Sequence, residues 1–283
     1  MKQFIALILI MAVSISMLAA CGKSTAANAP ETTAIPTEPT QPGEEGKTLK
    51  VLTLGNSGAV DCGHMLALIA NAEGYENFKL ATLYYSGCSL TMHVGFMSKN
   101  ESVYKLYLSS TEEPDKVPTI MNDVSMEQAL RYDYWDIIIM QGGVFEIAED
   151  VTYQDGKIQF IQDYVNQHKT NPNAVFAWHM PCPCPTDNDL RDMYPYTPNT
   201  YYTSYVKYND DRTTMYNAIT GAVSRNIVTD DSFVYLIPSC TAIENALTSY
   251  LEETDLHRDY VHMSDLGRVI TSYLWYCTLA GVD

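Results

Sequence analysis

Short apolar runs alternate with amphipathic stretches through most of the chain. The apolar runs lie at 50–54, 78–85, 135–140, 174–178 and 232–237. Helical spacing is found at 61–73, 157–169 and 203–227, Ser125 and Gln128 have capping-box spacing, and Ser264 can cap a last helix through Leu279. Apolar strands separated by helices indicate a parallel sheet covered on both faces. The pattern therefore predicts an α/β fold, a three-layer sandwich around a central five-stranded parallel sheet, with 101–120 as a small hairpin or insertion.

The first residues form a separate unit. Lys2 gives a basic start, residues 4–17 are apolar and uncharged, and small residues lead directly into Cys21. This is typical of a secretory signal peptide over 1–20. The end of the segment resembles a bacterial lipobox, which implies cleavage before Cys21 and lipidation of that residue. The alternative is an ordinary signal peptide followed by an incidental cysteine.

Two further regions follow the signal peptide. Residues 21–48 are rich in Ser, Thr, Pro and Glu, with little to bury, and are expected to be a disordered tether. Residues 49–283 have the length of one α/β domain. A lipid on Cys21 would hold this domain at an extracytoplasmic membrane surface without spanning the membrane.

Charge and aromatic content restrict the partners. The formal net charge of -17 argues against nucleic acid and anionic lipid headgroups as partners, so membrane contact is expected through the lipid alone. Six of the 21 tyrosines lie within 193–208, after the fourth predicted strand. Their rings could stack on sugars, and the alternative is that they pack this segment onto the sheet. The oligomeric state does not follow from the sequence.

Cysteine spacing leaves the pairing open. The cysteines beyond Cys21 are Cys62, Cys88, Cys182, Cys184, Cys240 and Cys277. An even number permits disulfides outside the cytoplasm, and a Cys62–Cys88 bridge is one option. Cys182 and Cys184 with His179 suggest a metal, but the spacing is not that of a zinc pair and no second pair follows. We expect no metal and no cofactor.

Candidate chemistry gathers at one edge of the predicted sheet. Ligands bind beyond the carboxyl ends of parallel strands. Ser57 follows the first strand, Gly87 the second and Gln141 the third, while Asp259 and His262 precede the last helix. We expect these segments to converge on one rim.

The residue types at this rim fit nucleophilic catalysis. Ser57 would attack an ester carbonyl, His262 would accept its proton, and Asp259 would orient the imidazole. The Asp-x-x-His spacing alone is weak, because Asp61 and His64 repeat it. His64 falls inside a predicted helix, which favours His262 as the base.

Other polar residues are secondary candidates. His257 and Asp255 are weaker alternatives for the base and its orienter. Asn56, His93 and His179 are candidates for substrate contact, with a brace for the turn as the alternative for Asn56 and packing as the alternative for the histidines.

The blocks together resemble the SGNH (GDSL-type) hydrolases, in a branch that has Gly55-Asn56-Ser57 where other members have Gly-Asp-Ser. The resemblance covers the whole folded domain and implies the flavodoxin-like SGNH fold. It also implies an oxyanion hole made by the Ser57 and Gly87 amides and the side chain at Gln141. The superfamily has Asn at that last position, and losing an oxyanion donor costs about 3 kcal/mol.

The resemblance implies ester hydrolysis without a cofactor. The compartment suggests acylated carbohydrate as one substrate class. One alternative is a catalytically weak or inactive lipoprotein on the same scaffold that binds glycans or another small ligand. Another is acyl transfer to an alcohol in place of water.

Overall fold

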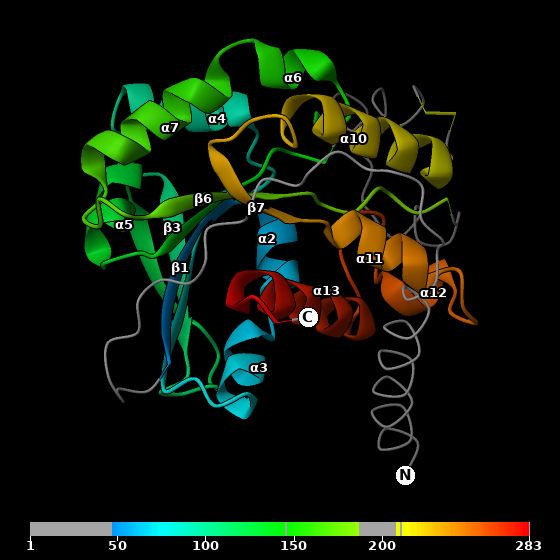
Figure 1. Ribbon diagram of the computed structural model, residues 1–283, viewed down its shortest axis with the longest axis horizontal. Helices are drawn as coiled ribbons and strands as arrows, with labels where there is room; N and C mark the ends of the chain where they lie inside the picture. The colour runs from blue at the N-terminus through cyan, green and yellow to red at the C-terminus, as the bar shows by residue number, and fades with distance from the viewer. Residues whose placement is uncertain (1–46, 145, 187–207, 210, 283) are drawn as a thin grey trace, which may run out of the picture. The chain divides into compact units, whose positions relative to one another are not determined.

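The sheet holds seven strands in the order β4-β3-β2-β1-β5-β6-β7 (Figure 1). The structure, a computed structural model, describes residues 47–144, 146–186, 208–209 and 211–282. The strands are β1 (Thr48–Gly55), β2 (Asn77–Tyr84), β3 (Tyr104–Ser110), β4 (Thr119–Val124), β5 (Ile137–Met140), β6 (Val175–His179) and β7 (Phe233–Ile237). The five strands expected from the apolar runs are β1, β2, β5, β6 and β7.

These five strands are all parallel, in the spatial order β2-β1-β5-β6-β7. Numbered among themselves along the chain, they run 2-1-3-4-5, which is the flavodoxin-like order. The order reverses between β1 and β5, so the crevice expected to bind ligands lies beyond the ends of these two strands. The predicted fold class is confirmed.

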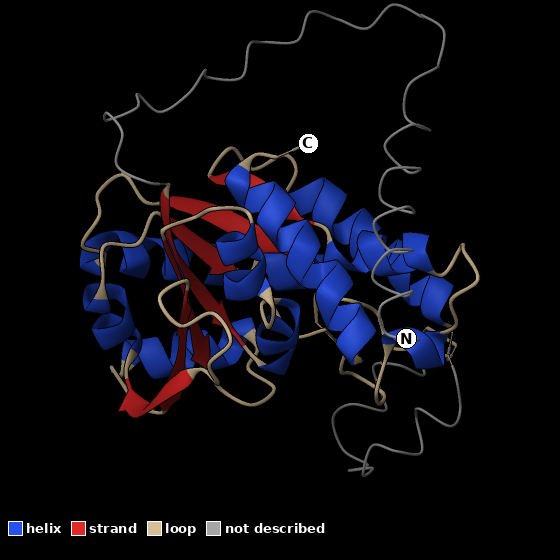
Figure 2. Cartoon of the chain, turned by 90° about the horizontal axis from the view of Figure 1, so that it is seen from below, coloured by secondary structure: helices blue, strands red, loops and turns tan. Residues whose placement is uncertain are grey.

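Helices cover both faces of the sheet (Figure 2). On one face lie α4 (Leu90–Ser98), α5 (Met126–Tyr132), α6 (Asp150–Gln154), α7 (Lys157–His168) and α10 (Arg212–Asn226). On the other lie α2 (Ser57–Cys62), α3 (Leu66–Ala72), α11 (Ser239–Ala246), α12 (Glu253–Leu256) and α13 (Asp265–Ala280). No helix among the described residues is long and apolar enough to cross a bilayer.

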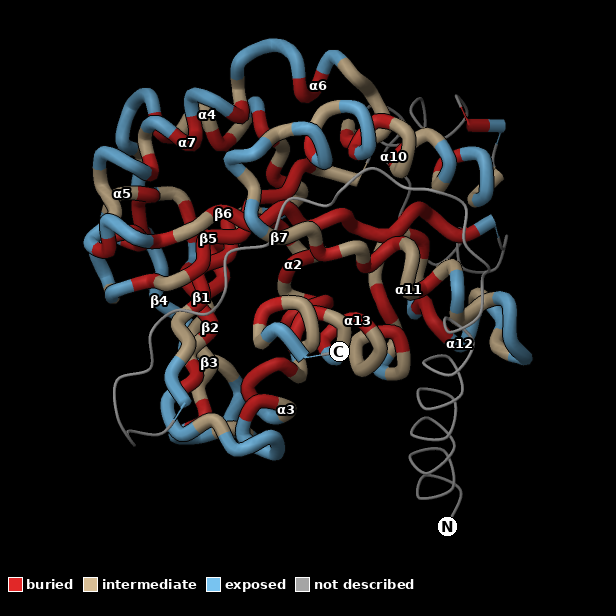
Figure 3. Tube along the Cα trace, viewed as in Figure 1, coloured by how far each residue is buried: buried red, intermediate tan, exposed pale blue. Residues whose placement is uncertain are grey.

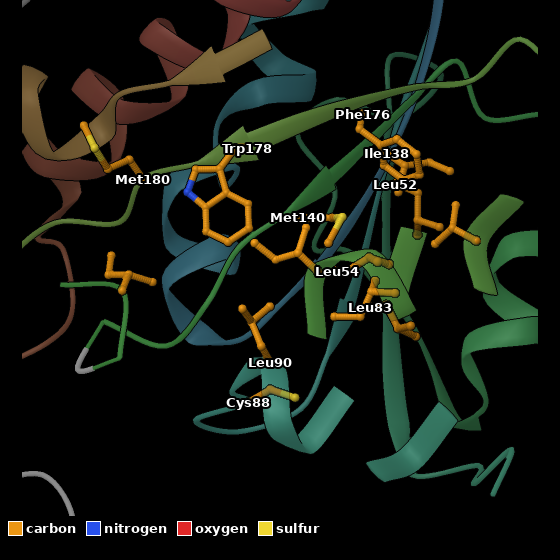
Figure 4. Packing of buried hydrophobic residues seen from close by; sticks show 14 of the residues in the cluster. Leu52, Leu54, Leu83, Cys88, Leu90, Ile138, Met140, Phe176, Trp178 and Met180 are labelled. Atoms are coloured by element: carbon orange, nitrogen blue, oxygen red, sulfur yellow. The ribbon is translucent and has the colours of Figure 1, made fainter. Parts of the chain in front are cut away.

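Side chains that alternate along the strands pack into two hydrophobic cores. Leu52 and Leu54 of β1 pack toward α4 and α7, whereas Val51 packs toward α3 and α13. Figure 4 shows the first core, in which strand side chains meet Leu90 at the start of α4. The central strands β1, β2, β5 and β6 are buried over most of their length, while the helices expose their outer sides (Figure 3). Burial on both faces explains why the sequence of these strands is continuously apolar.

The segment 101–120 contributes an antiparallel extension of the sheet. β3 pairs antiparallel with β2, and β4 pairs antiparallel with β3. The expected hairpin is present, but it joins the central sheet, so the sheet is wider than the five strands predicted. All residues of β4 except Val124 are exposed, and an edge strand with one solvated side lacks the continuous apolar run that marks the others.

One predicted helix is divided. The pattern at 61–73 predicts a single helix, but α2 ends at Cys62 and α3 begins at Leu66. The Ser272 hydroxyl of α13 donates to the Cys62 carbonyl at 2.8 Å and accepts from the Met65 N–H at 3.0 Å. A side chain distant in sequence therefore satisfies the backbone groups that the break leaves unpaired.

The predicted helix ends are largely confirmed. Ser125 and Gln128 form the capping box of α5, and the Ser264 side chain accepts from Gly267 N at the start of α13. The start of α10 differs from the prediction. This helix begins at Arg212, behind the Asp211 cap, whereas the pattern placed its start at Thr203, in a stretch outside the described residues.

Candidate active site

Ser57 is the first residue of α2, directly beyond the carboxyl end of β1. Asn56 caps this helix, and its Oδ1 accepts from Gly58 N at 3.0 Å. Ser57 itself is half-buried. The tight turn requires glycine at 55, because a Cβ there would lie 2.6 Å from the Ala59 Cβ. The turn thus presents the serine at the rim of the sheet.

The second block lies against this turn. Gly87 has φ 59, a left-handed conformation that favours glycine. The next residue, Cys88, accepts a hydrogen bond at its carbonyl from Asn56 Nδ2 at 3.0 Å. Asn56 therefore joins the serine turn to the Gly87 turn, as the brace expected of it.

Asp259 and His262 form a close pair. His262 Nδ1 lies 2.8 Å from Asp259 Oδ2 and 3.0 Å from Oδ1. Asp259 Oδ1 also accepts from the main-chain N–H groups of Val261 and His262, each at 2.9 Å. Burial alone would raise the pKa of Asp259, but these hydrogen bonds and the imidazole outweigh it and hold the pKa below its ordinary value. The carboxylate stays ionised and holds the ring in one orientation.

Asp61 ties this pair to the serine helix. Its carboxylate accepts from Met263 N at 3.0 Å and pairs with Arg258 at 3.1 Å and Arg268 at 2.8 Å. Ser57 and Asp61 stand four residues apart on α2, so they share one helix face. The residue after His262 is thus bonded one helical turn from Ser57, which holds the distal pair beside the helix that begins with Ser57.

Gln141 and His179 lie beneath the serine turn. Gln141 Nε2 donates to Asn56 Oδ1 at 2.8 Å, and Gln141 Oε1 lies 2.6 Å from His179 Nδ1. The Gln141 side chain is 1% exposed and His179 is 0% exposed. This placement differs from the expected oxyanion-hole role of Gln141, because the amide is bonded on both sides below the rim.

Glu146 is a second brace, which the sequence pattern did not reveal. Its Oε1 accepts from Leu90 N at 2.8 Å and from Gly143 N at 2.7 Å, which joins α4 to the loop after β5. Burial raises the pKa of Glu146, although these two hydrogen bonds oppose the change. Side-chain amides and one carboxylate therefore join the three loops that follow β1, β2 and β5.

The sequence matches one established family. The profile described as Domain of unknown function (DUF4886) matches residues 50–283. The chain belongs to the DUF4886 family. A crystal structure of a DUF4886 protein from Bacteroides uniformis has 25% identity and a TM-score of 0.71, covering 83% of this chain and 84% of that one.

A more distant structure is the family 3 carbohydrate esterase of Clostridium thermocellum. It has 10% identity and a TM-score of 0.46, covering 83% of this chain and 97% of that one. No curated protein matches the sequence. The comparisons establish the family and not an activity. The chemistry of this DUF4886 protein is therefore inferred from the geometry of its own site.

The secondary histidine candidates are buried in the DUF4886 fold. His93 is buried in α4 with Nδ1 2.9 Å from the Tyr104 hydroxyl, and burial lowers its pKa to about 4. His257 is also buried, with Nδ1 3.3 Å from the Glu253 carbonyl, and burial likewise lowers its pKa to about 4. His93 and His179 are therefore both buried, whereas substrate contact was expected of them at the rim, and each ring is hydrogen-bonded to a neighbouring side chain.

The six described cysteines are free thiols. The Cys62–Cys88 bridge, one of the options left open, is not formed. Among the described residues, no group of three or more His, Cys, Asp or Glu side chains could hold a metal ion.

Several predictions concern residues beyond those described. The signal peptide, Cys21 and nearly all of the tether lie outside the described residues, as does most of the tyrosine-rich segment. Of its six tyrosines, Tyr208 is described, and its buried side chain donates to Glu149 at 2.9 Å.

Proposed function

We propose that this DUF4886 protein is a serine ester hydrolase of the SGNH type. Ser57 is the nucleophile, His262 the general base and Asp259 the residue that orients the base. The observation that carries the proposal is the 2.8 Å contact between His262 and Asp259, on a loop bonded to the helix that begins with Ser57.

The tautomer of His262 supports this assignment. A carboxylate only accepts, so Nδ1 carries the proton that faces Asp259, and the lone pair of the neutral ring is on Nε2. Nε2 would take the proton of the Ser57 hydroxyl as its oxygen attacks the ester carbonyl. The same proton then passes to the leaving alcohol, while Asp259 stabilises the imidazolium.

Main-chain amides supply the oxyanion hole in this proposal. The N–H groups of Ser57 and Gly87 lie on two turns that Asn56 holds together. Their relative position is therefore fixed before substrate arrives, which is what oxyanion stabilisation requires. Gln141 supports these turns from below, where its side chain is bonded to Asn56 and His179.

The experiment is hydrolysis of p-nitrophenyl acetate by the purified full-length protein. We expect Ser57→Ala to lower kcat by at least about 10³-fold. Ser98→Ala, an exposed serine at the end of α4, is the matched control and should retain wild-type turnover. Absence of wild-type turnover, or a Ser57→Ala variant as active as wild type, would reject the hydrolase. Glycan binding without turnover would favour the alternative of a binding lipoprotein.

The proposed location is the outer side of a bacterial membrane, with the protein anchored through Cys21. The support is the basic start, the apolar run and the small residues before the cysteine. Mass spectrometry of the mature protein should find Cys21 at the N-terminus with attached acyl chains. A Cys21→Ala variant should leave the membrane fraction, and retention there would contradict the lipid anchor. Acylated carbohydrate is the proposed natural ester, from the predicted compartment and the superfamily resemblance.

A further inference from the structure

A line of hydrogen bonds runs beneath the serine turn and crosses the sheet. It joins five side chains in the order Trp275, Ser239, His179, Gln141 and Asn56. Asn56 is 8% exposed, Gln141 1%, and the other three 0%. A polar atom left unpaired in such a place destabilises the fold, so the direction of the bonds is constrained.

The direction is fixed first at the serine end. Gly58 N–H can only donate, so the Asn56 atom that faces it at 3.0 Å is Oδ1. The Cys88 carbonyl can only accept, so Nδ2 faces it at 3.0 Å. With Oδ1 already placed, Gln141 must donate to it through Nε2. The Gln141 oxygen then faces His179, and His179 Nδ1 must carry a proton.

The other end of the line accommodates the same tautomer. The indole N–H of Trp275 can only donate, and it reaches Ser239 Oγ at 3.1 Å. The Ser239 hydroxyl is then free to donate its own proton to His179 Nε2 at 3.0 Å. With His179 neutral and its proton on Nδ1, every bond in the line has one donor and one acceptor, and the Ser239 proton also has a partner.

The geometry points to His179 as a positioning residue for the Ser57 nucleophile. Its Nδ1–H tautomer sets the orientation of the Gln141 amide, which sets that of Asn56. Asn56 in turn holds Gly58, one residue beyond Ser57, and Cys88, one residue beyond Gly87. This inference rests on the proposed function for its catalytic consequence, but the hydrogen-bond line can be tested without any turnover.

The first test measures the protonation of His179 and the protection of the serine turn directly. Nitrogen-15 NMR of the full-length protein should show a protonated Nδ1 and an unprotonated Nε2 in His179. Hydrogen exchange at the Gly58 amide then reports whether the line reaches the serine turn. We expect His179→Leu to accelerate exchange at Gly58, because the Gln141 oxygen loses its donor. His93→Leu removes another buried histidine, bonded to Tyr104, and should leave Gly58 exchange unchanged.

Conservative variants separate positioning from general packing. His179→Asn can place an N–H where Nδ1 stood, whereas His179→Gln places its amide nearer the position of Nε2. We expect His179→Leu and His179→Gln to lower kcat by about 10- to 100-fold with little change in KM, because the nucleophile is misplaced. His179→Asn should restore both kcat and slow Gly58 exchange. If His179→Leu does not fold, the comparison of His179→Asn with His179→Gln still tests the positioning role.

The outcomes keep the two proposals apart. Gly58 exchange that is the same in wild type, His179→Leu and His179→Gln overturns the positioning role, whether or not the protein hydrolyses esters. A protonated Nε2 in wild type overturns it also. Turnover that survives Ser57→Ala overturns the hydrolase alone, because the NMR measurements do not depend on it.

Discussion

The chain contains the pattern Asp-x-x-His twice, and the two copies do different things. Asp259 holds the ring of its own histidine, His262, at 2.8 Å. Asp61 instead accepts from the main-chain N–H of Met263, far along the chain. His64 is exposed in the turn after α2.

The difference lies in the backbone that carries each copy. Asp259 begins a turn in which its carboxylate accepts from the N–H groups two and three residues later, so the ring of His262 is brought back to it. Asp61 lies near the end of a helix, where its carboxylate is 3% exposed and faces a distant loop. The same four-residue spacing gives a carboxylate–imidazole pair, the proposed catalytic one, in a turn and a structural anchor in a helix.

The largest expected effect separates the two histidines. His262→Ala should lower ester turnover by about 10³- to 10⁴-fold, because it removes the base that the proposed mechanism assigns to the Ser57 proton. His64→Ala should stay within about twofold of wild type, since its ring is exposed and its Asp is engaged elsewhere. The measurement is kcat/KM on p-nitrophenyl acetate. Equal losses in the two variants would remove the functional distinction between the copies.

The next effect concerns the stability contributed by the two carboxylates that meet Arg268. Asp61→Asn should lower the free energy of unfolding by about 2–3 kcal/mol, because buried Asp61 anchors Arg258, Arg268 and the Met263 amide together. Asp265 pairs with the same Arg268 at 3.3 Å but is 91% exposed. Asp265→Asn should therefore cost below about 0.5 kcal/mol. Urea denaturation of both variants measures the contrast, and similar losses would contradict the anchoring role.

A smaller catalytic effect is expected at Asp259. Asp259→Asn should lower kcat by less than His262→Ala does, because the Asn oxygen can still accept from His262 Nδ1 and the base itself remains. The single-turnover rate on p-nitrophenyl acetate gives the chemical step. Unchanged turnover would show that the main-chain bonds of this loop suffice to hold the ring.

The smallest effect is a pH dependence of stability at Asp259. Its folded pKa lies below the ordinary value of 3.8, so the ionised form stabilises the fold above that value. This contribution is present at neutral pH and is lost as pH falls through the folded pKa. Asp259→Asn should therefore be less stable than wild type at pH 7, by less than about 1 kcal/mol since the group is partly exposed. Melting curves at pH 7 and below pH 4 should show the gap closing, and a gap that widens in acid would contradict the assignment.

The central fold could be predicted from local pattern. Strands buried on both faces must be apolar throughout, and caps such as Ser125 and Ser264 act within one helical turn. β4 could not be found in this way, because it is an exposed edge strand without apolar alternation. The break after Cys62 depends on Ser272, which no local pattern connects to it.

The candidate site shows the same limit. The placement of Ser57 beyond β1 and the pairing of Asp259 with His262 could be predicted, because short blocks and strand ends mark these residues. The partners of Gln141 could not, since Asn56 and His179 meet it only after β1, β5 and β6 have paired. A buried hydrogen-bond line has no sequence period, and its members are chosen by distance across the sheet.

The bond between Asp61 and Met263 has a consequence for the order of events during biosynthesis. The ribosome produces the nucleophile in the first strand–helix unit and the base only near the end of the domain, and the two are joined by contacts far apart in sequence. Such long-range contacts form late in folding. Under the proposed mechanism, a partly translated or partly exported chain carries Ser57 without its base. Ester hydrolysis would then begin only when the loop that carries Asp259 and His262 docks on α2. Catalytic turnover would therefore indicate that the domain has finished folding.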